Sequence, residues 1–181
     1  RFNNFSHTLF DTSRGVNKFL EADTTTSQQN RILANDGLTT FRTNGFTIGA
    51  YGNINDNSSH YVAWSFKKAE KFFDIVTYTG DGTEPRTINH NLNCAVGRMV
   101  VKRLDTAANW MVYDKNYGTS SANGNFHNYW NGRTGTEFAQ QNVWYDTTPT
   151  TTQFTIGNNP AVNSSGGYYI AYLWAHDTSS N

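Results

Sequence analysis

Apolar and polar side chains alternate in short runs along much of this chain, with the period of a half-buried β-strand. The clearest alternating run is residues 73–78, and the short apolar runs within residues 98–103 and 110–113 predict two further strands. Residues 79–83, which follow the first run, form a turn rich in residue types that tolerate positive φ. Helical spacing of apolar side chains extends over residues 14–23 and predicts one short helix of two turns. The pattern as a whole predicts an all-β protein.

One part of this pattern occurs twice. Residues 46–49 read Phe-Thr-Ile-Gly, as do residues 154–157. The similarity continues without a gap into the aromatic stretches 61–66 and 169–174. Each copy predicts two strands joined by a connector rich in Asn, Ser and Gly. The repeat therefore indicates a tandem duplication.

The duplication divides the chain into two unequal modules. Residues 72–181 predict one nearly complete antiparallel β-sandwich. Residues 1–71 contain the trailing strands of a first, incomplete module and end in a charged stretch that predicts a solvated linker. Since half a module would expose strand edges, we expect an upstream segment or strands from a neighbouring subunit to complete it. We also expect Ile48 and Ile156 to have equivalent surroundings.

Composition and charge exclude several classes of protein. Charged residues make up 15% of the 181 residues and aromatic residues another 15%, which is unlike a disordered chain. The formal net charge is zero, so we expect neither nucleic acid nor anionic lipid as a partner. Cys94 is the single cysteine, which excludes an intrachain disulfide, and we interpret it as a small buried hydrophobe. Apolar runs are too short to cross a bilayer, so we expect no membrane insertion.

Two stretches carry a resemblance to a known family. Residues 72–114 contain FFDIVTYTGDGT, RTINHNLNCAVGRMVVKR and NWMVYD, and residues 9–67 contain LFDTSRGVNKFLEADT, GFTIG and YVAWSFK. In this order the motifs resemble a repeat module of virion structural and tail-fibre proteins of marine bacteriophages. The resemblance implies an antiparallel, jelly-roll-like β-sandwich of the concanavalin or laminin-G type, with a partial second copy at the N-terminus. It implies no catalytic residue set.

A segment rich in aromatic and amide side chains is the candidate binding site. Over residues 116–145, Tyr and Trp are interleaved with Asn, Gly, Ser and Thr, a mixture that suits stacking on a sugar ring and hydrogen bonding to its hydroxyls. The candidate carbohydrate contacts are Tyr117, Tyr129, Trp130, Trp144 and Tyr145. The same aromatic side chains would also suit a sandwich core or an interface between subunits, and the sequence leaves these alternatives open.

The sequence predicts neither a metal site nor a catalytic site. The histidines are far apart and lack the short spacing of zinc ligands. Five carboxylates in loops are candidate calcium ligands, although there is no Asp-x-Asp-x-Asp loop and turn formation explains most of them: Asp11, Asp74, Asp81, Asp105 and Asp114. Fourteen acidic residues permit the carboxylate pair of a glycosidase without identifying one. We therefore expect no metal, no cofactor and no enzymatic activity.

Taken with the resemblance, these observations predict a non-enzymatic phage virion structural protein: a tail fibre, a tail appendage or a capsid decoration. We expect it in the extracellular particle, as a homo-oligomer that contacts other virion proteins and a host-surface glycan through a β-rich surface. The alternative is a carbohydrate-binding or adhesin module of a bacterial surface protein. A polysaccharide hydrolase is a third hypothesis.

Overall fold

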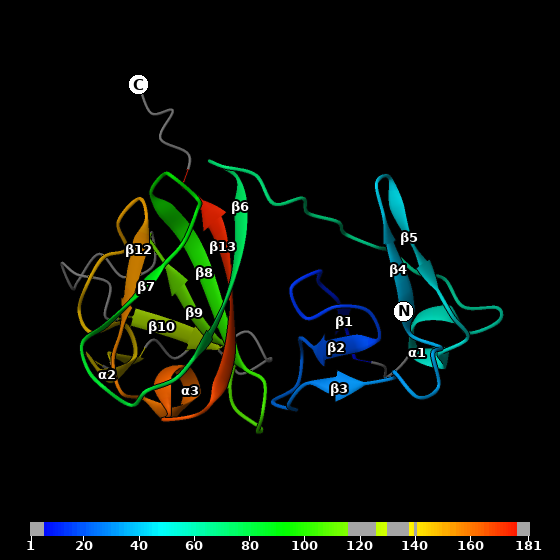
Figure 1. Ribbon diagram of the computed structural model, residues 1–181, viewed down its shortest axis with the longest axis horizontal. Coiled ribbons are helices and arrows are strands. Elements are labelled where there is room, and N and C mark those ends of the chain that lie inside the picture. The colour runs from blue at the N-terminus through cyan, green and yellow to red at the C-terminus, as the bar shows by residue number, and fades with distance from the viewer. Residues whose placement is uncertain (1–5, 116–125, 130–137, 140, 177–181) are drawn as a thin grey trace.

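The computed structural model describes residues 6–115, 126–129, 138–139 and 141–176 (Figure 1). Within these residues the chain is predominantly β, and its strands pair in antiparallel fashion. The helices α1 (Gly52–Asn55), α2 (Gln141–Trp144) and α3 (Pro160–Asn163) are each a single turn. The predicted β class is confirmed.

The largest sheet has six strands in the order β11–β10–β9–β8–β13–β6. These strands are β6 (Phe73–Thr79), β8 (Val96–Arg103), β9 (Met111–Asp114), β10 (Phe126–Tyr129), β11 (Phe138–Ala139) and β13 (Tyr168–Ala175). β13 pairs with β6 along one side and with β8 along the other. β6, β8 and β9 coincide with the strands predicted over residues 73–78, 98–103 and 110–113, so those predictions are confirmed.

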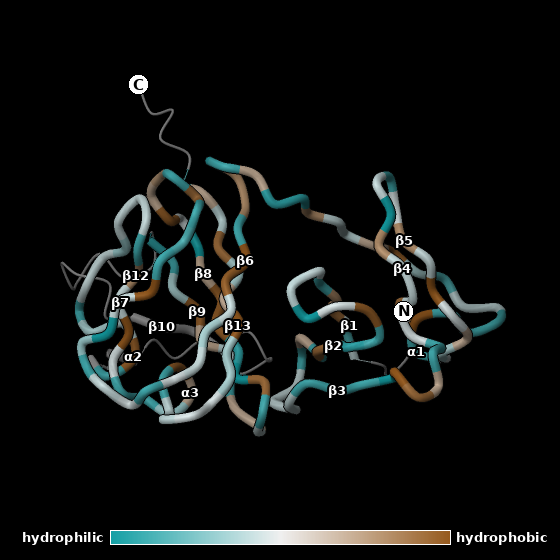
Figure 2. The backbone as a smooth tube through the Cα atoms, viewed as in Figure 1, coloured by the Kyte–Doolittle hydropathy of each residue, from teal (hydrophilic) through white to brown (hydrophobic). Residues whose placement is uncertain are grey.

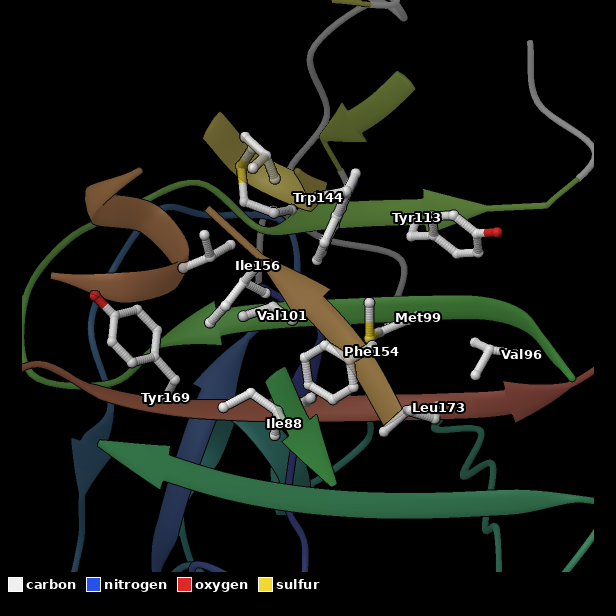
Figure 3. Packing of buried hydrophobic residues seen from close by; sticks show 14 of the residues in the cluster. Ile88, Val96, Met99, Val101, Tyr113, Trp144, Phe154, Ile156, Tyr169 and Leu173 are labelled. Carbon is white, nitrogen blue, oxygen red and sulfur yellow. The ribbon is translucent and has the colours of Figure 1, made fainter. Parts of the chain in front are cut away.

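A two-stranded sheet packs on one face of the large sheet. It consists of β7 (Arg86–Asn89) and β12 (Gln153–Ile156). Phe154 and Ile156 point into a cluster that contains Met99 of β8 and is almost wholly buried (Figure 3). Helices α2 and α3 contribute further side chains to this cluster. Burying these side chains supplies most of the apolar stabilisation on this face.

The N-terminal segment covers the opposite face. Strands β1 (Thr8–Leu9), β2 (Lys18–Glu21) and β3 (Gln29–Asn30) form a small antiparallel sheet. From it, Leu20 is fully buried in a second cluster together with Ile170 of β13. Side chains of β6, β8 and β13 are therefore buried on both faces of the sheet, which accounts for the hydrophobic stretches along these strands (Figure 2).

The helix predicted over residues 14–23 is wrong, because strand β2 occupies the middle of this segment. The adjacent residues Phe19 and Leu20 are both buried but face opposite ways. Phe19 contacts the rings of Phe10 and Tyr51, whereas Leu20 packs on the large sheet. A strand can bury neighbouring side chains in two layers, and an isolated two-turn helix is too short to be stable alone.

The internal repeat is confirmed over its first half. β5 (Gly45–Ile48) and β12 are each followed by a glycine, Gly49 and Gly157, and then by a one-turn helix at the same spacing, α1 and α3. A Cβ on Gly49 would lie 2.6 Å from the Cα of Asp36, and one on Gly157 would lie 2.3 Å from the carbonyl oxygen of Asn142. Both glycines therefore permit the same close approach of two backbone segments.

The predicted equivalence is wrong over the second half of the repeat. The second copy continues into β13, the strand between β6 and β8, whereas residues 61–66 are extended but belong to no strand. β5 pairs with β4 (Leu38–Arg42), and Ile48 is half-buried while Ile156 is fully buried. The physical reason is that, in the described part of the chain, residues 61–66 have no flanking strands like those of β13.

Candidate functional site

The structure describes two side chains of the five aromatic residues predicted to contact carbohydrate. Trp144 lies inside the core cluster (Figure 3) and is 1% exposed. Tyr145 is half-buried with a left-handed φ of 48°. Tyr117 and Trp130 lie outside the described residues, and the backbone of Tyr129 ends β10 beside β9. The prediction is corrected for Trp144: a ring with no exposed face does not stack on a sugar.

The aspartates considered as calcium ligands are dispersed, and each pairs with a cationic side chain. The pairs are Asp11–Arg14, Asp74–Lys68, Asp81–Arg86, Asp105–Arg103 and Asp114–Arg98. Hydrogen bonds from Arg103 lower the pKa of Asp105 to about 2. Among the residues that the structure describes, no group of three His, Cys, Asp or Glu side chains is placed to hold a metal ion. These aspartates are engaged in ion pairs that stabilise loops and strand ends.

A buried ionic cluster joins the N-terminal segment to β13. Arg14 donates to the carboxylate of Asp11 through Nε and to the carbonyl of Leu9 through Nη2. The hydroxyl of Tyr172 donates to Oδ2 of Asp11 over 2.7 Å. The side chains of Asp11 and Arg14 are only 3% and 2% exposed. Residues 11–15, which read Asp-Thr-Ser-Arg-Gly, therefore form a turn, completed by Gly15 at φ 87°, that is hydrogen-bonded to β13, the strand between β6 and β8.

Lys102 of β8 makes a second contact between the large sheet and the N-terminal segment. Its side chain is fully buried, and Nζ donates to the carbonyl oxygens of Thr25 and Ala108 over 3.0 and 2.8 Å. Burial lowers the pKa of Lys102 to about 8. An amine with this pKa has nucleophilic character near neutral pH. With no exposed surface and two carbonyl partners, however, Lys102 is placed to hold the N-terminal segment rather than to meet a substrate.

Exposed apolar side chains occur close together in the segment that connects the two halves of the chain. We define the aromatic stripe as Val62, Trp64, Phe66 and Phe72, which are 80%, 84%, 51% and 49% exposed. The segment that carries it spans the gap between α1 and β6 (Figure 1). Apolar side chains this exposed and this close in sequence are typical of an interaction surface. The sequence analysis missed this surface because the repeat predicted residues 61–66 to be a buried strand.

Aromatic packing fixes the C-terminal end of the stripe. The ring of Phe66 lies 5.6 Å from that of Phe73, the first residue of β6, and 6.1 Å from that of Trp174 in β13. The chain then turns through residues 70–72, and Ala69 exchanges two backbone hydrogen bonds with Phe73, each of 3.0 Å. The stripe is thus attached to the edge of the large sheet.

A tyrosine latch fixes the other end. Tyr61 donates its hydroxyl hydrogen to the carbonyl of Gly52 over 3.1 Å and accepts from the amide of Asp56 over 2.9 Å. In the second copy the equivalent residue is Tyr169. Its hydroxyl donates to the carbonyl of Pro160, the first residue of α3, over 2.8 Å and accepts from the amide of Ser164, the residue after α3, over 2.7 Å. The two copies therefore share the same entry into the segment that becomes β13 in one copy and stays unpaired in the other.

Comparison with known proteins gives a family. The family described as "Domain of unknown function (DUF7483)" matches residues 1–179. The chain belongs to this family. The DUF7483 match spans both the N-terminal segment and the large sheet on which it packs. No curated protein and no solved structure matches the DUF7483 chain. Of the helices that the structure describes in it, none has the length and apolar character needed to span a membrane.

Proposed function

We propose that this DUF7483 protein is a non-enzymatic structural component of a bacteriophage virion, in a tail fibre, a tail appendage or a capsid decoration. It presents an oligomeric β-rich surface and attaches the particle to the host surface. The observation that carries the proposal is the aromatic stripe, in which Trp64 is 84% exposed on a segment held at both ends. A fixed apolar surface of this kind suits assembly with other proteins.

The architecture around the stripe supports a scaffold role. We propose that β7 and β12 together with the large sheet form a jelly-roll-like sandwich of the concanavalin or laminin-G type, as the motif resemblance implies. Ion pairs such as Asp105–Arg103 and Asp74–Lys68 hold the ends of strands and turns. The formal net charge of zero gives no long-range repulsion between copies, which suits close packing in a particle.

A carbohydrate-binding or adhesin module is the second candidate. The exposed indole of Trp64 favours it, because a flat aromatic ring open to solvent is a platform for a sugar ring. The exposed side chain of His60 precedes the stripe in the sequence and offers ring nitrogens to sugar hydroxyls. In this role the site is the stripe rather than the buried Trp144.

Immunogold electron microscopy of phage particles with antibodies against this chain tests the virion role. We expect gold on a tail, an appendage or a capsid; particles without label would overturn the proposal. A glycan array separates the two candidates, with Trp64→Ala as the test variant and Tyr168→Ala, another exposed aromatic at 59%, as the matched control. Micromolar binding of a defined saccharide that only Trp64→Ala abolishes would favour the adhesin module.

A further inference from the structure

We propose that residues 62–66 of one copy add as a strand to the free edge of β6 in a second copy, so that two chains exchange these segments in a symmetric dimer. The inference deepens the oligomeric part of the proposed function. It does not depend on a virion role, because both surfaces belong to this chain. Addition of an extended segment to a sheet edge is an established mode of recognition.

The segment has the character of a strand that lacks its partners. Residues 61–66 match residues 169–174 in sequence, and the latch of Tyr61 reproduces that of Tyr169. In the second copy the chain beyond this latch is β13, paired on both sides. In the first copy it is extended, and Val62 and Trp64 are exposed. The sequence therefore favours a strand, and only a neighbouring strand is needed to form one.

The edge of β6 is open along its C-terminal half. Phe73 exchanges both backbone hydrogen bonds with Ala69. The N–H of Ile75 donates to Asp74 Oδ1, and its carbonyl accepts from Lys68 Nζ. Backbone groups of alternate residues point to the same edge of a strand. Thr77 and Thr79 therefore present their N–H and C=O to the free edge, beyond the part that Lys68 and Asp74 close.

Within one chain, the segment contacts this edge only at its C-terminal end, where Phe66 packs on Phe73 and Ala69 pairs with it, and it then leads away from Thr77 and Thr79 (Figure 1). It leads into the β4–β5 and α1 region, which is joined to Asn17, the residue before β2, by two backbone hydrogen bonds. Arg31 N donates to Asn17 O over 2.7 Å, and Asn17 N donates to Leu38 O over 2.8 Å. β2 is in turn fixed by Leu20 on the face of the large sheet. Closure within one chain would break these contacts, whereas a second copy meets the edge without breaking them.

The chemistry of the two surfaces is complementary. β6 already pairs on its inner side with β13, the repeat equivalent of residues 61–66. Val76 and Tyr78 of β6 are half-buried, so an added strand would cover apolar surface on both partners. Neither residues 62–66 nor residues 76–79 carry a charge, which removes like-charge repulsion across the new strand pair.

Two proline variants test the proposal on the full chain. Ser65→Pro removes an N–H from the donated segment, which lies outside every described strand. Thr77→Pro removes an outward N–H from β6 and spares the pairing with β13, as proline does on an edge strand. Leu33→Ser, at a residue whose side chain is fully exposed elsewhere, is the control. By sedimentation velocity we expect dimers for the wild type and Leu33→Ser, and monomers for both proline variants.

A mixture of the two proline variants provides a complementation test. Thr77→Pro retains a competent segment and Ser65→Pro retains a competent edge, so the mixture should form a heterodimer with one of the two contacts. A monomeric wild type, dimeric proline variants or a mixture without heterodimer would each overturn the proposal. If Thr77→Pro lowers the melting temperature, its monomeric state could reflect misfolding, and the oligomeric state of Ser65→Pro then decides whether residues 62–66 are needed for the dimer. If the chain is monomeric but antibodies detect it on virions, this inference alone is overturned. If the chain is dimeric but absent from particles, the virion role alone is overturned.

Discussion

Tyr172 donates a 2.7 Å hydrogen bond from its hydroxyl to the carboxylate of Asp11, 161 positions earlier in the chain. Both residues are buried, and Arg14 Nε donates to the same carboxylate oxygen, Oδ2, and neutralises its charge. Burial raises the pKa of Tyr172 well above its ordinary value, so the phenol stays protonated and keeps donating. The contact makes the N-terminal segment a layer of the same folded unit as the large sheet.

Replacing Tyr172 with Phe should destabilise the fold. The variant leaves the buried carboxylate of Asp11 with one partner fewer, and a hydrogen bond to a charged group contributes about 1.5–3 kcal/mol. Denaturant unfolding measures the difference. Tyr168→Phe, at an exposed tyrosine of the same strand, is the matched control and should change the free energy of unfolding by less than about 0.5 kcal/mol. Equal effects of the two variants would contradict the role of the contact.

Lys102 should make the free energy of unfolding depend on pH in the alkaline range. Folding lowers its pKa from 10.5 to about 8, so its contribution to stability is present above 10.5 and is lost as pH falls through 8. Between pH 8 and 9.5 the free energy of unfolding of the wild type should rise relative to Lys102→Met, by at most about 1.4 kcal/mol per pH unit. Denaturant unfolding along this pH series checks the slope, and parallel curves for the two proteins would show that Lys102 does not titrate there.

His90 should make the stability of the fold depend on pH in the acidic range. Burial lowers its pKa below the ordinary 6.5, although the carboxylate of Asp74 opposes the shift. The neutral ring accepts a hydrogen bond from the amide of Leu92 at Nδ1. Its contribution to stability is therefore full above pH 6.5 and is lost as the pH falls below it. His90→Asn keeps an acceptor, so melting temperatures from pH 7.5 to 4.5 should fall less for this variant; an identical pH dependence in both proteins would refute the assignment.

The glycines of the repeat should be equally intolerant of substitution. Gly157→Ala would force a Cβ against the backbone of Asn142, and Gly49→Ala would force one against Asp36. Overpacking of this kind costs about 1–3 kcal/mol. Gly45→Ala is the control, because a Cβ there meets nothing within 4 Å. Thermal unfolding of the three variants tests whether the first copy is as closely packed as the second; wild-type stability of Gly49→Ala would show that it is not.

Patterns within single segments of the sequence were sufficient to predict several strands. β6 follows from alternating side chains and β8 and β9 from short apolar runs, and the strand, glycine and one-turn helix of the repeat recur at the same spacing. The apolar spacing over residues 14–23 predicted a helix, but the middle of this segment is β2. Pairing with β1 and β3 and burial in two layers outweigh a weak helical pattern. These stabilising contacts are long-range, so the sequence pattern alone does not reveal them.

Exposure of the aromatic residues was not predictable from residue type. Trp144 and Trp64 both lie in segments rich in aromatic and polar residues, yet one is 1% and the other 84% exposed. What separates them is whether other elements cover them: β12 and the large sheet enclose Trp144, and no described strand pairs with the segment of Trp64. The candidate site thus moved from residues 116–145 to the aromatic stripe.

Hydrogen–deuterium exchange at increasing protein concentration tests most directly whether residues 62–66 are a contact surface between chains. The amides of these residues should exchange rapidly in dilute solution and slowly at high concentration, while residues 169–174 of β13 stay protected throughout. Rapid exchange of residues 62–66 at every concentration would contradict the account.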